Sequence, residues 1–445
     1  MVIIGKTGLI FDFVYIFGEK HENRYIELPE NCGEENEFSR SLAEIKNNPG
    51  KVVVCTQNEQ KMKKRYLEMG LLSGRDYYFF SDLQPVFLAM QQKNGVTDQE
   101  ALYLWETYQK IFSAPHGRYR PCHHPLYEAE ITENGDIYTC CSAIMPFTIG
   151  NIRDTKLKTV WHSARAKLLR LSLLNGTAVF CSREKCANLQ PCRGKPDYHA
   201  EQVSDYPLIL NLAADATCNL SCPSCRTHVI GADPQEIQEK ERWLSNVEKE
   251  LYPNLRHLYI AGNGECMVSR VYRDYISDRV IPYFSGQLHL VTNGQIWNEE
   301  LLNAVLSAFR PEVLISVDAW KKETYETLRR GGCYENILAN IQKYVQLKKE
   351  KYLSCVVVRF VVQTANYQEI PEFIDGMRAL GADRMEFTRL VNGPSFAPGE
   401  FQRSSLLDEL GSLKEPYLSF FEEKIWPRLG PDIAADAAFL PGRKA

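Results

Sequence analysis

Three cysteines close together in the chain offer the clearest chemistry in this sequence. Cys218, Cys222 and Cys225 stand in a C-x3-C-x2-C spacing, directly after an apolar run at residues 208–212. Cysteine thiolates are the usual protein ligands of iron-sulfur clusters, and a [4Fe-4S] cluster needs four attachments. Three thiols therefore leave one iron without a protein ligand, and that open iron is a place where a small molecule can bind and react.

A second group of cysteines precedes this loop. An Asn-Gly turn within residues 128–141 predicts a β-hairpin, which would return Cys140 or its neighbour Cys141 toward Cys122. The candidate ligands of this second site are Cys122, Cys140, Cys181, Cys186 and Cys192, with Cys141 as a substitute for its neighbour. Four such thiols bind either zinc or an iron-sulfur cluster. The cysteine spacing alone allows either zinc or a cluster, and the nearby C-x3-C-x2-C loop favours the cluster.

Strand and helix patterns alternate after residue 206 and would position the three-cysteine loop. Apolar runs typical of buried strands recur six times, with segments typical of helices between them. The predicted strands are residues 208–212, 255–260, 288–291, 312–317, 355–362 and 384–388, and the predicted helices are 234–251, 271–280, 298–309, 334–347 and 370–380. Six such repeats predict an α/β fold with a parallel sheet, a partial (β/α)6 TIM-like barrel over residues 206–391.

Functional residues of such a sheet belong on the loops that follow its strands. The cysteine loop follows the first predicted strand, and small or polar residues follow the next three. These candidates are Gly262, Asn263, Gly264 and Glu265 after the second strand, Thr292 and Asn293 after the third, and Ser316 and Asp318 around the end of the fourth. Each pattern alone is also an ordinary turn or helix cap. Their position on one rim favours a binding site.

Two further segments flank these regions. The N-terminal one predicts a small Rossmann-like α/β accessory domain, with strands at 2–5, 51–55 and 77–80 and a helix at 59–70. The C-terminal one predicts a helical cap with a helix at 406–426. The expected domains are thus residues 1–110 (accessory), 118–196 (second cysteine group), 206–391 (barrel) and 392–445 (cap).

Composition limits the classes of function. The formal charge of −4 gives no broad basic surface for nucleic acid, and 44% hydrophobic with 24% charged residues is typical of a globular protein. No apolar run reaches the ~18 residues that span a bilayer, and the N-terminus has no secretion-signal pattern. Fourteen cysteines without such a signal favour metal ligation over disulfides. We expect a cytoplasmic protein with no membrane or nucleic-acid partner.

The cysteine spacing and the segments after it resemble the radical S-adenosylmethionine (radical SAM) superfamily over roughly residues 207–391. The resemblance implies that Cys218, Cys222 and Cys225 hold a [4Fe-4S] cluster and that S-adenosylmethionine binds at its open iron. It also implies reductive cleavage of S-adenosylmethionine to a 5′-deoxyadenosyl radical, which abstracts a substrate hydrogen.

The same resemblance implies contacts to S-adenosylmethionine. The segment from Gly262 to Glu265 is similar to the family's glycine-rich GGE motif, which binds the methionine amino group, although Asn263 replaces its first glycine. Ser316 and Asp318 resemble positions that contact the ribose or the carboxylate. Arg329 or Arg330 would help to hold that carboxylate, because guanidinium pairs well with it.

The second cysteine group resembles the SPASM and related twitch extensions that hold auxiliary iron-sulfur clusters in radical SAM enzymes. The similarity rests on Cys122, the hairpin with Gly135-x4-Cys140, the sequence Ile149–Ile152 and the terminal cysteines. Here the extension precedes the barrel, whereas in most relatives it follows. The terminal group also has too few cysteines for two clusters, so the resemblance implies one auxiliary [4Fe-4S] cluster.

The resemblance implies a peptide- or protein-modifying enzyme of the natural-product maturase type, because SPASM-type relatives often act on peptides. An external electron donor such as flavodoxin or ferredoxin would be its partner. A dehydrogenase or epimerase of a sugar or aminocyclitol is the alternative within enzymes. A non-catalytic interaction protein with structural zinc is the alternative of another class. No catalytic acid or base is assigned from the sequence.

Overall fold

The computed structural model covers the chain, and most of the residues it describes lie after residue 202. The described residues are 2–6, 24–28, 32–55, 59–72, 76–79, 120, 122–145, 148–153, 155–163, 165–166, 169–170, 173, 178, 181, 186, 188–189, 203–231, 233–260, 262, 264–393, 395–408 and 411–441. The chain divides into two compact units. The first comprises residues 1–123, 164–181 and 189–201, and the second comprises residues 124–163, 182–188 and 202–445.

The first unit contains a small parallel sheet. Its elements are β1 Val2–Lys6, β2 Arg24–Leu28, α2 Glu34–Asn47, β3 Val52–Cys55, α3 Glu59–Glu68 and β4 Tyr78–Phe79. The strand order is β2-β1-β3-β4, and every pairing is parallel. Phe38 of α2 stacks on Tyr66 of α3 in the core, with ring centroids 5.0 Å apart. The sequence predicts all of these elements except β2 and α2, which are short or largely polar.

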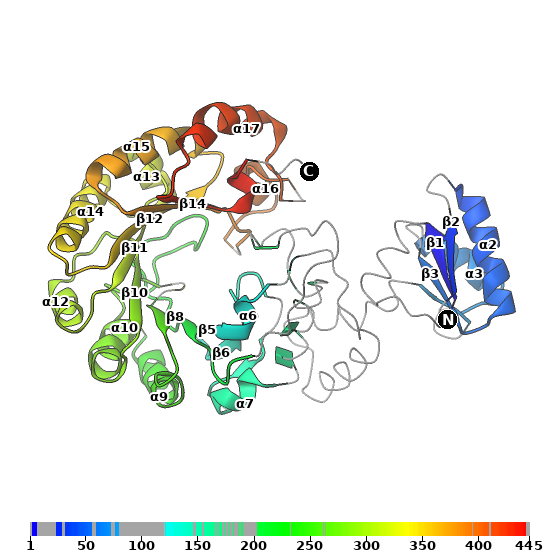
Figure 1. The fold of residues 1–445 in the computed structure, drawn as a ribbon, viewed down its shortest axis with the longest axis horizontal. Coiled ribbons are helices and arrows are strands. Elements are labelled where there is room, and N and C mark those ends of the chain that lie inside the picture. The colour runs from blue at the N-terminus through cyan, green and yellow to red at the C-terminus, as the bar shows by residue number, and fades with distance from the viewer. Residues whose placement is uncertain are drawn as a thin grey trace. The chain divides into compact units, whose positions relative to one another are not determined.

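The second unit is built on one large sheet, which Figure 1 shows as a curved row of strands with helices along its outer side. Its strands, in order across the sheet, are β14 Ile433–Ala435, β13 Arg384–Arg389, β12 Cys355–Val362, β11 Glu312–Ser316, β10 Gln287–Thr292, β9 His257–Ile260, β8 Ile209–Ala213, β5 Glu128–Thr132, β6 Asp136–Tyr138 and β7 Gly150–Asn151. Pairing is parallel from β14 to β5 and antiparallel to β6 and β7. All six strands predicted for the barrel are present.

The predicted hairpin belongs to this same sheet. β5 pairs in parallel with β8, from Glu128 opposite Ile209 to Thr132 opposite Ala213. The strand before the Asn-Gly turn therefore lies beside the strand that leads into the cysteine loop. The sequence predicts the hairpin but not this pairing, because local patterns do not show which distant strands are neighbours.

The helices of the second unit flank the sheet, and the longer ones run along its outer side (Figure 1). They are α6 His124–Tyr127, α7 Leu157–Trp161, α9 Pro234–Leu251, α10 Arg270–Tyr275, α11 Ile281–Tyr283, α12 Glu299–Ala308, α13 Lys322–Leu328, α14 Tyr334–Lys349, α15 Ile370–Leu380, α16 Glu400–Ser404 and α17 Glu415–Phe420. Single π-helical turns, Ile276–Val280 and Phe421–Ile425, follow α10 and α17, and short 3₁₀ turns occupy Tyr367–Glu369, Trp426–Arg428 and Ala437–Phe439. No helix in the described part of the chain is long and apolar enough to cross a membrane.

Local sequence explains why the longest of these helices starts where it does. Asp233 caps α9 by accepting a hydrogen bond from the N–H of Gln235, and Pro234 occupies the first helical turn. Trp243 and Val247 then fall on the buried side of the helix. α9 thus packs against the sheet directly after the cysteine loop.

The C-terminal segment differs from its prediction in two ways. The helix expected over residues 406–426 begins only at Glu415. The preceding residues turn back on themselves, because Leu407 and Leu413 form a β-bridge and the N–H of Gly411 donates to the carbonyl of Asp408. The segment also supplies β14, which adds a parallel strand beside β13.

Candidate functional site

The loop after β8 brings the three cysteines of the C-x3-C-x2-C pattern to one pocket. The N–H of Cys218 donates to the carbonyl of Ile230 (3.0 Å), and the N–H of Cys225 donates to the carbonyl of Cys222 (2.9 Å). Cys218 and Cys222 are buried, whereas Cys225 is exposed. All three line a pocket of about 110 Å³, which is several times the ~15 Å³ that one water molecule needs.

Each of the three sulfur atoms has a hydrogen-bond donor near it. A backbone N–H lies 3.5 Å from Sγ of Cys218, Nη2 of Arg226 lies 3.4 Å from Sγ of Cys225, and Nη1 of Arg329 lies 3.9 Å from Sγ of Cys222. Burial raises the pKa of the Cys218 and Cys222 thiols, and the two arginines act in the opposite direction. Nearby cations favour the thiolate, which is the form that binds iron. Sequence analysis does not single out Arg226, although it directly follows the last cysteine.

Arg329 is held in place by a buried ion pair with Asp318. Nη2 of Arg329 lies 2.6 Å from Oδ2 of Asp318, and the N–H of Val361 donates to Oδ1 (2.7 Å). Asp318 has a left-handed backbone with φ of 67°, a conformation that aspartate adopts more readily than most residues. Burial lowers the pKa of Arg329, but the charges of Asp318 and Cys222 outweigh it and raise the pKa overall. Arg329 therefore stays protonated.

The pocket offers a donor that the protein itself does not satisfy. Nε of Arg329 is buried and has no hydrogen-bond partner among the residues that the structure describes. Such an unmet group costs about 1–3 kcal/mol, so a bound acceptor at this pocket would be stabilising. Three thiols, two neighbouring guanidinium groups and an unmet N–H fit an anionic iron-sulfur cluster held by three protein ligands.

Glu265 joins the loop after β9 to the loop after β10. It is 1% exposed, and its carboxylate accepts hydrogen bonds from the Thr292 hydroxyl (2.7 Å) and from the N–H groups of Asn293 (2.6 Å) and Met267 (3.1 Å). Burial raises the pKa of Glu265, and these donors oppose the shift. The residue lines the cysteine pocket, and both of its oxygens are engaged by protein donors.

Gly262 and Gly264 let the loop after β9 lie directly against the chain that leads to the cysteines. Gly262 has φ of +121°, and a Cβ there would lie 2.3 Å from Cβ of Ala213. A Cβ on Gly264 would lie 2.3 Å from the carbonyl oxygen of Asp215. Close packing of two backbones therefore requires both glycines. Asn263, between them, lies outside the described residues.

Replacing Gly264 by alanine should displace the cysteine loop, because the Asp215 carbonyl that blocks the new Cβ belongs to the backbone. We expect a destabilisation of about 1–3 kcal/mol and a lower iron content after reconstitution, measured by thermal unfolding and by an iron assay. Gly231→Ala is the control, because a Cβ there meets no atom within 4 Å. Equal iron contents in the two variants would contradict this role.

Asn293 and Ser316 both line the pocket, but within the described residues only the side chain of Asn293 is hydrogen-bonded to the protein. Nδ2 of Asn293 donates to Oδ1 of Asn219 (2.9 Å) and lies 3.7 Å from Sγ of Cys218, so it braces the cysteine loop. Ser316, at the end of β11, lines the pocket, and its hydroxyl makes no hydrogen bond within the described chain. The hydroxyl is thus available to a ligand. Arg330 contributes its carbonyl, which accepts a backbone hydrogen bond from the cysteine loop.

Asp215 and Lys240 form a buried ion pair that sequence reasoning missed. Nζ of Lys240 lies 2.8 Å from Oδ1 of Asp215, and the two side chains are 7% and 6% exposed. Asp215 also accepts from the Ser269 hydroxyl (2.6 Å) and from the N–H of Thr217 (3.3 Å). These contacts fix the chain immediately before Cys218. The available signal was a carboxylate within an apolar stretch, which needs a buried partner.

The candidate ligands of the second cysteine site fall on both compact units. Cys140, Cys141 and Cys186 belong to the second unit, and Cys122 and Cys181 belong to the first. Cys192 lies outside the described residues. Burial and the charge of nearby carboxylates raise the pKa of Cys141 to about 11. A bound metal ion would itself favour the thiolate, so Cys140 and Cys141 both stay candidate ligands.

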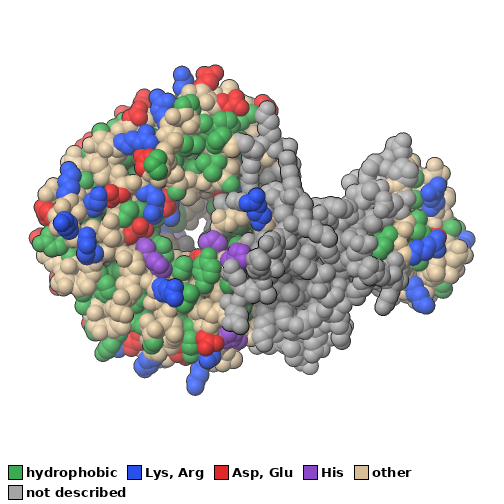
Figure 2. Space-filling view, in the orientation of Figure 1, with side chains coloured by type: hydrophobic (Ala, Val, Ile, Leu, Met, Phe, Trp, Pro, Cys, Tyr) green, Lys and Arg blue, Asp and Glu red, His purple; other side chains and the backbone are tan. Residues whose placement is uncertain are grey.

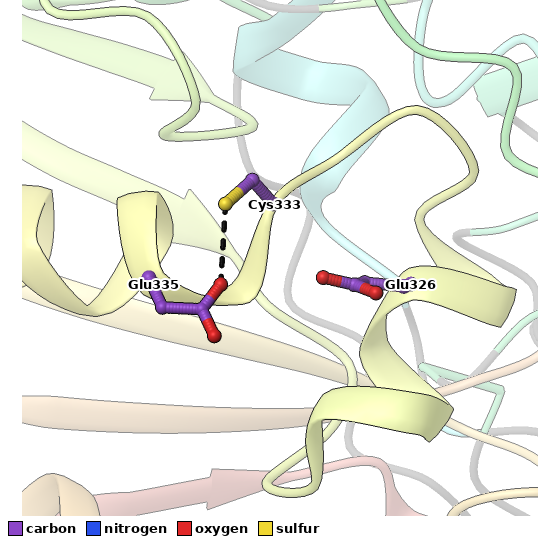
Figure 3. A group of neighbouring side chains, drawn as sticks. All are labelled: Glu326, Cys333 and Glu335. Carbon is purple, nitrogen blue, oxygen red and sulfur yellow. Dashed lines mark hydrogen bonds between the residues drawn. The ribbon is translucent and has the colours of Figure 1, made fainter.

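One other group of metal-ligand type occurs in the described residues, and none of its members lines the pocket of Cys218, Cys222 and Cys225. Glu326, Cys333 and Glu335 present ligand atoms within 4.8 Å of one another. Figure 3 shows the three side chains. Nζ of Lys322 lies 2.7 Å from Glu335 and 4.0 Å from Glu326. The ammonium group of Lys322 therefore offsets one of the two negative charges, and the group is a partly exposed ion-pair cluster.

Comparison with protein families matches residues 122–194 to SPASM, an iron-sulfur cluster-binding domain. The matched segment contains all of the candidate ligands of the second cysteine site. The alternative of a structural zinc site is therefore disfavoured by a finding that is independent of the Cys218 loop.

Known proteins similar to this chain match it over part of their length. Molybdenum cofactor biosynthesis protein 1 of Drosophila melanogaster is 24% identical over 245 residues, which are 53% of this chain and 40% of that protein. The chain thus spans less than half of this curated relative. Streptococcus suis SuiB bound to the precursor peptide SuiA gives a TM-score of 0.36 at 14% identity, over 52% of this chain and 49% of that one. The structure of anSMEcpe with bound AdoMet gives 0.32 at 18% identity, over 41% and 51%.

Proposed function

We propose that this chain, whose residues 122–194 match the SPASM domain, is a radical SAM enzyme. It would form a 5′-deoxyadenosyl radical from S-adenosylmethionine and abstract a hydrogen atom from a peptide or protein. Its cofactors are a [4Fe-4S] cluster, S-adenosylmethionine and an iron-sulfur cluster in the SPASM domain. The observation that carries the proposal is the single pocket lined by Cys218, Cys222 and Cys225, with a hydrogen-bond donor beside each sulfur. Three thiol ligands leave one iron of a [4Fe-4S] cluster open.

Different residues of the pocket would stabilise the cluster ligands, contact S-adenosylmethionine and position Arg329. When bound, the cluster supplies the electron for reductive cleavage of S-adenosylmethionine. Arg226 and Arg329 stabilise negative charge on the sulfur ligands. The Ser316 hydroxyl and the backbone around Gly264 face the same pocket and would contact S-adenosylmethionine. Asp318 keeps Arg329 in place, so it acts as a positioning residue.

A peptide or protein is the substrate class that the SPASM match favours, because enzymes with this extension often modify peptides. An external donor such as flavodoxin or ferredoxin would deliver the electron. Cys122, Cys140, Cys181, Cys186 and Cys192 are the proposed ligands of the auxiliary cluster, which needs four of them. That cluster would accept an electron from the substrate radical, bind the substrate or stiffen the domain.

Metal content and product formation test the proposal. Protein purified without oxygen should be brown and carry about eight iron and eight sulfide per chain, two [4Fe-4S] clusters. With S-adenosylmethionine and dithionite it should form 5′-deoxyadenosine, measured by liquid chromatography, and none without the reductant. Colourless protein that carries zinc alone would contradict the proposal that this chain is a radical SAM enzyme.

The substrate class has a test of its own. If a short open reading frame lies beside the gene, its peptide should change mass when incubated with the reduced enzyme and S-adenosylmethionine, as measured by mass spectrometry. A neighbouring set of sugar-modifying genes, together with an unchanged peptide, would instead favour a small-molecule dehydrogenase or epimerase.

A further inference from the structure

The large sheet has a polar face that the proposed cofactor chemistry does not use. Side chains alternate between the two faces of a strand, and Ser316 points into the cysteine pocket. Arg359 lies opposite Ser316 in register, and Glu386 lies opposite Arg359. By the same register, the polar residues on this face include His257, Tyr259, His289, Glu312, Ser316, Arg359, Arg384 and Glu386. Alternating with them are buried apolar residues, among them Leu258, Leu290, Val313, Val358, Met385 and Phe387.

The two arginines of the polar face are partly exposed. Figure 2 shows an opening in the middle of this unit, with histidine and charged side chains at its edge. Arg359 and Arg384 are 35% and 38% exposed. A ligand in this opening would therefore meet charged groups instead of an apolar wall.

Ion pairs and hydrogen bonds connect the polar residues across four strands. Nδ1 of His289 lies 3.1 Å from Oε1 of Glu312, and Nη2 of Arg384 lies 3.4 Å from both Glu312 oxygens. The same Nη2 lies 3.2 Å from Oε1 of Glu386, and Arg359 places Nη2 2.8 Å and Nε 3.2 Å from Oε2 of Glu386. The two arginines and two glutamates balance in charge.

Protein donors satisfy the carboxylates of this network, whereas the guanidinium groups keep N–H groups without a protein acceptor among the described residues. Every oxygen of Glu312 and Glu386 accepts at least one hydrogen bond. Nη1 of Arg359 and both Nε and Nη1 of Arg384 have no acceptor within the described residues. Arginine carries five N–H donors, so the unmet capacity on this face is that of a donor. A ligand that matches it must offer acceptor oxygens.

We infer that Arg359 and Arg384 form a subsite that binds a carboxylate group of the substrate. The inference rests on the proposed function, because this subsite shares a face with Ser316 and so opens toward the cofactor pocket. Carboxylates pair with guanidinium through two parallel hydrogen bonds. Glu312 and Glu386 would repel a singly charged carboxylate less than a doubly charged phosphate.

Strand register places this subsite below the cofactor pocket. Arg384 lies opposite Val357, two residues before Arg359 on β12, which is about 7 Å further from the loops at the strand ends. A substrate anchored there presents a carbon a few bonds from its carboxylate to the pocket. An acidic side chain of a peptide and a small dicarboxylic acid both meet this requirement.

Binding of defined probes tests the subsite on the reconstituted protein with S-adenosylmethionine present. We expect N-acetyl-L-glutamate N-methylamide to bind at least about tenfold more tightly than the uncharged N-acetyl-L-glutamine N-methylamide in calorimetric titrations, because charged hydrogen bonds are lost in the amide. Arg384→Gln and Arg359→Gln should each weaken the glutamate probe about tenfold or more. Arg384→Lys keeps the positive charge but loses the paired N–H donors of the guanidinium group. It should therefore bind the glutamate probe less tightly than the unmodified protein and more tightly than Arg384→Gln.

Arg378→Gln is the matched control, because Arg378 is 37% exposed, lies on α15 instead of on a strand of the polar face, and pairs with Asp432. It should bind the glutamate probe as the unmodified protein does. Glutarate serves as the second probe: tighter binding of glutarate points to a free dicarboxylic acid, and tighter binding of the capped glutamate points to a peptide side chain.

Three results would overturn the subsite. These are equal binding of the glutamate and glutamine probes, no binding of either acid at millimolar concentration, and unchanged binding in both Arg→Gln variants. The first two need no variant, so poor folding of a variant leaves the test intact. Probe binding without 5′-deoxyadenosine formation would contradict the proposed function alone. Formation of 5′-deoxyadenosine without probe binding would contradict this subsite alone.

Discussion

Replacing Cys218, Cys222 and Cys225 together by alanine should abolish 5′-deoxyadenosine formation and remove about four iron atoms per chain, while the iron of the SPASM domain remains. The three thiols line one pocket, and no other thiol lines it in the described part of the chain. Chromatography of the nucleoside product and an iron and sulfide assay measure the two effects. This is the largest change in activity that we expect from any substitution.

Cys333→Ala is the control for the triple variant, because this cysteine lies at the start of α14 with its thiol toward Glu335. It should retain both the product and the full iron content. If the triple variant still formed 5′-deoxyadenosine, the active cluster would lie elsewhere. If it lost all of its iron, the two sites would not be independent.

Replacing Asp318 by asparagine should destabilise the second unit strongly, because it breaks a buried ion pair. Asparagine keeps the shape of Asp318 and the acceptor for Val361, but it leaves the guanidinium of Arg329 buried without its counter-charge. Breaking a buried pair in this way costs about 3–5 kcal/mol. We expect the melting temperature of the unit to fall by at least about 5 °C, measured by thermal unfolding of the reconstituted protein.

Asp432→Asn is the comparison, since it removes the same charge from the more exposed pair with Arg378. An exposed pair contributes about 0–1 kcal/mol, so this variant should melt within about 2 °C of the unmodified protein. Equal shifts in the two variants would show that the Asp318 to Arg329 pair is no more than a surface contact.

Local patterns in the sequence were enough to predict the β/α repeats. Alternation of apolar strands with amphipathic helices predicted β8 to β13, because the residue pattern of each element reflects which of its faces is buried. The same logic failed where an element has little local signal. β14 is three residues long, α2 is largely polar, and the turn before α17 depends on a bridge between Leu407 and Leu413.

The sequence predicted the ligands of the candidate site but not the buried residues that hold its loops in place. The spacing of Cys218, Cys222 and Cys225 predicted a shared site, and the structure places them on one pocket with Glu265, Thr292 and Ser316. The structure adds what surrounds them. Glu265 is saturated by donors from its neighbouring loops, and the buried pair of Asp215 and Lys240 fixes the start of the cysteine loop.

The sequence by itself determined the ligand chemistry that the candidate site offers, because ligand type and spacing are properties of a few adjacent residues. The tertiary structure decided which groups tune and select that chemistry. Arg329 reaches Cys222 across 107 residues of chain, and Arg384 meets Glu312 across 72. Such contacts form only when parallel strands bring distant segments into register, and no pattern within one segment records them.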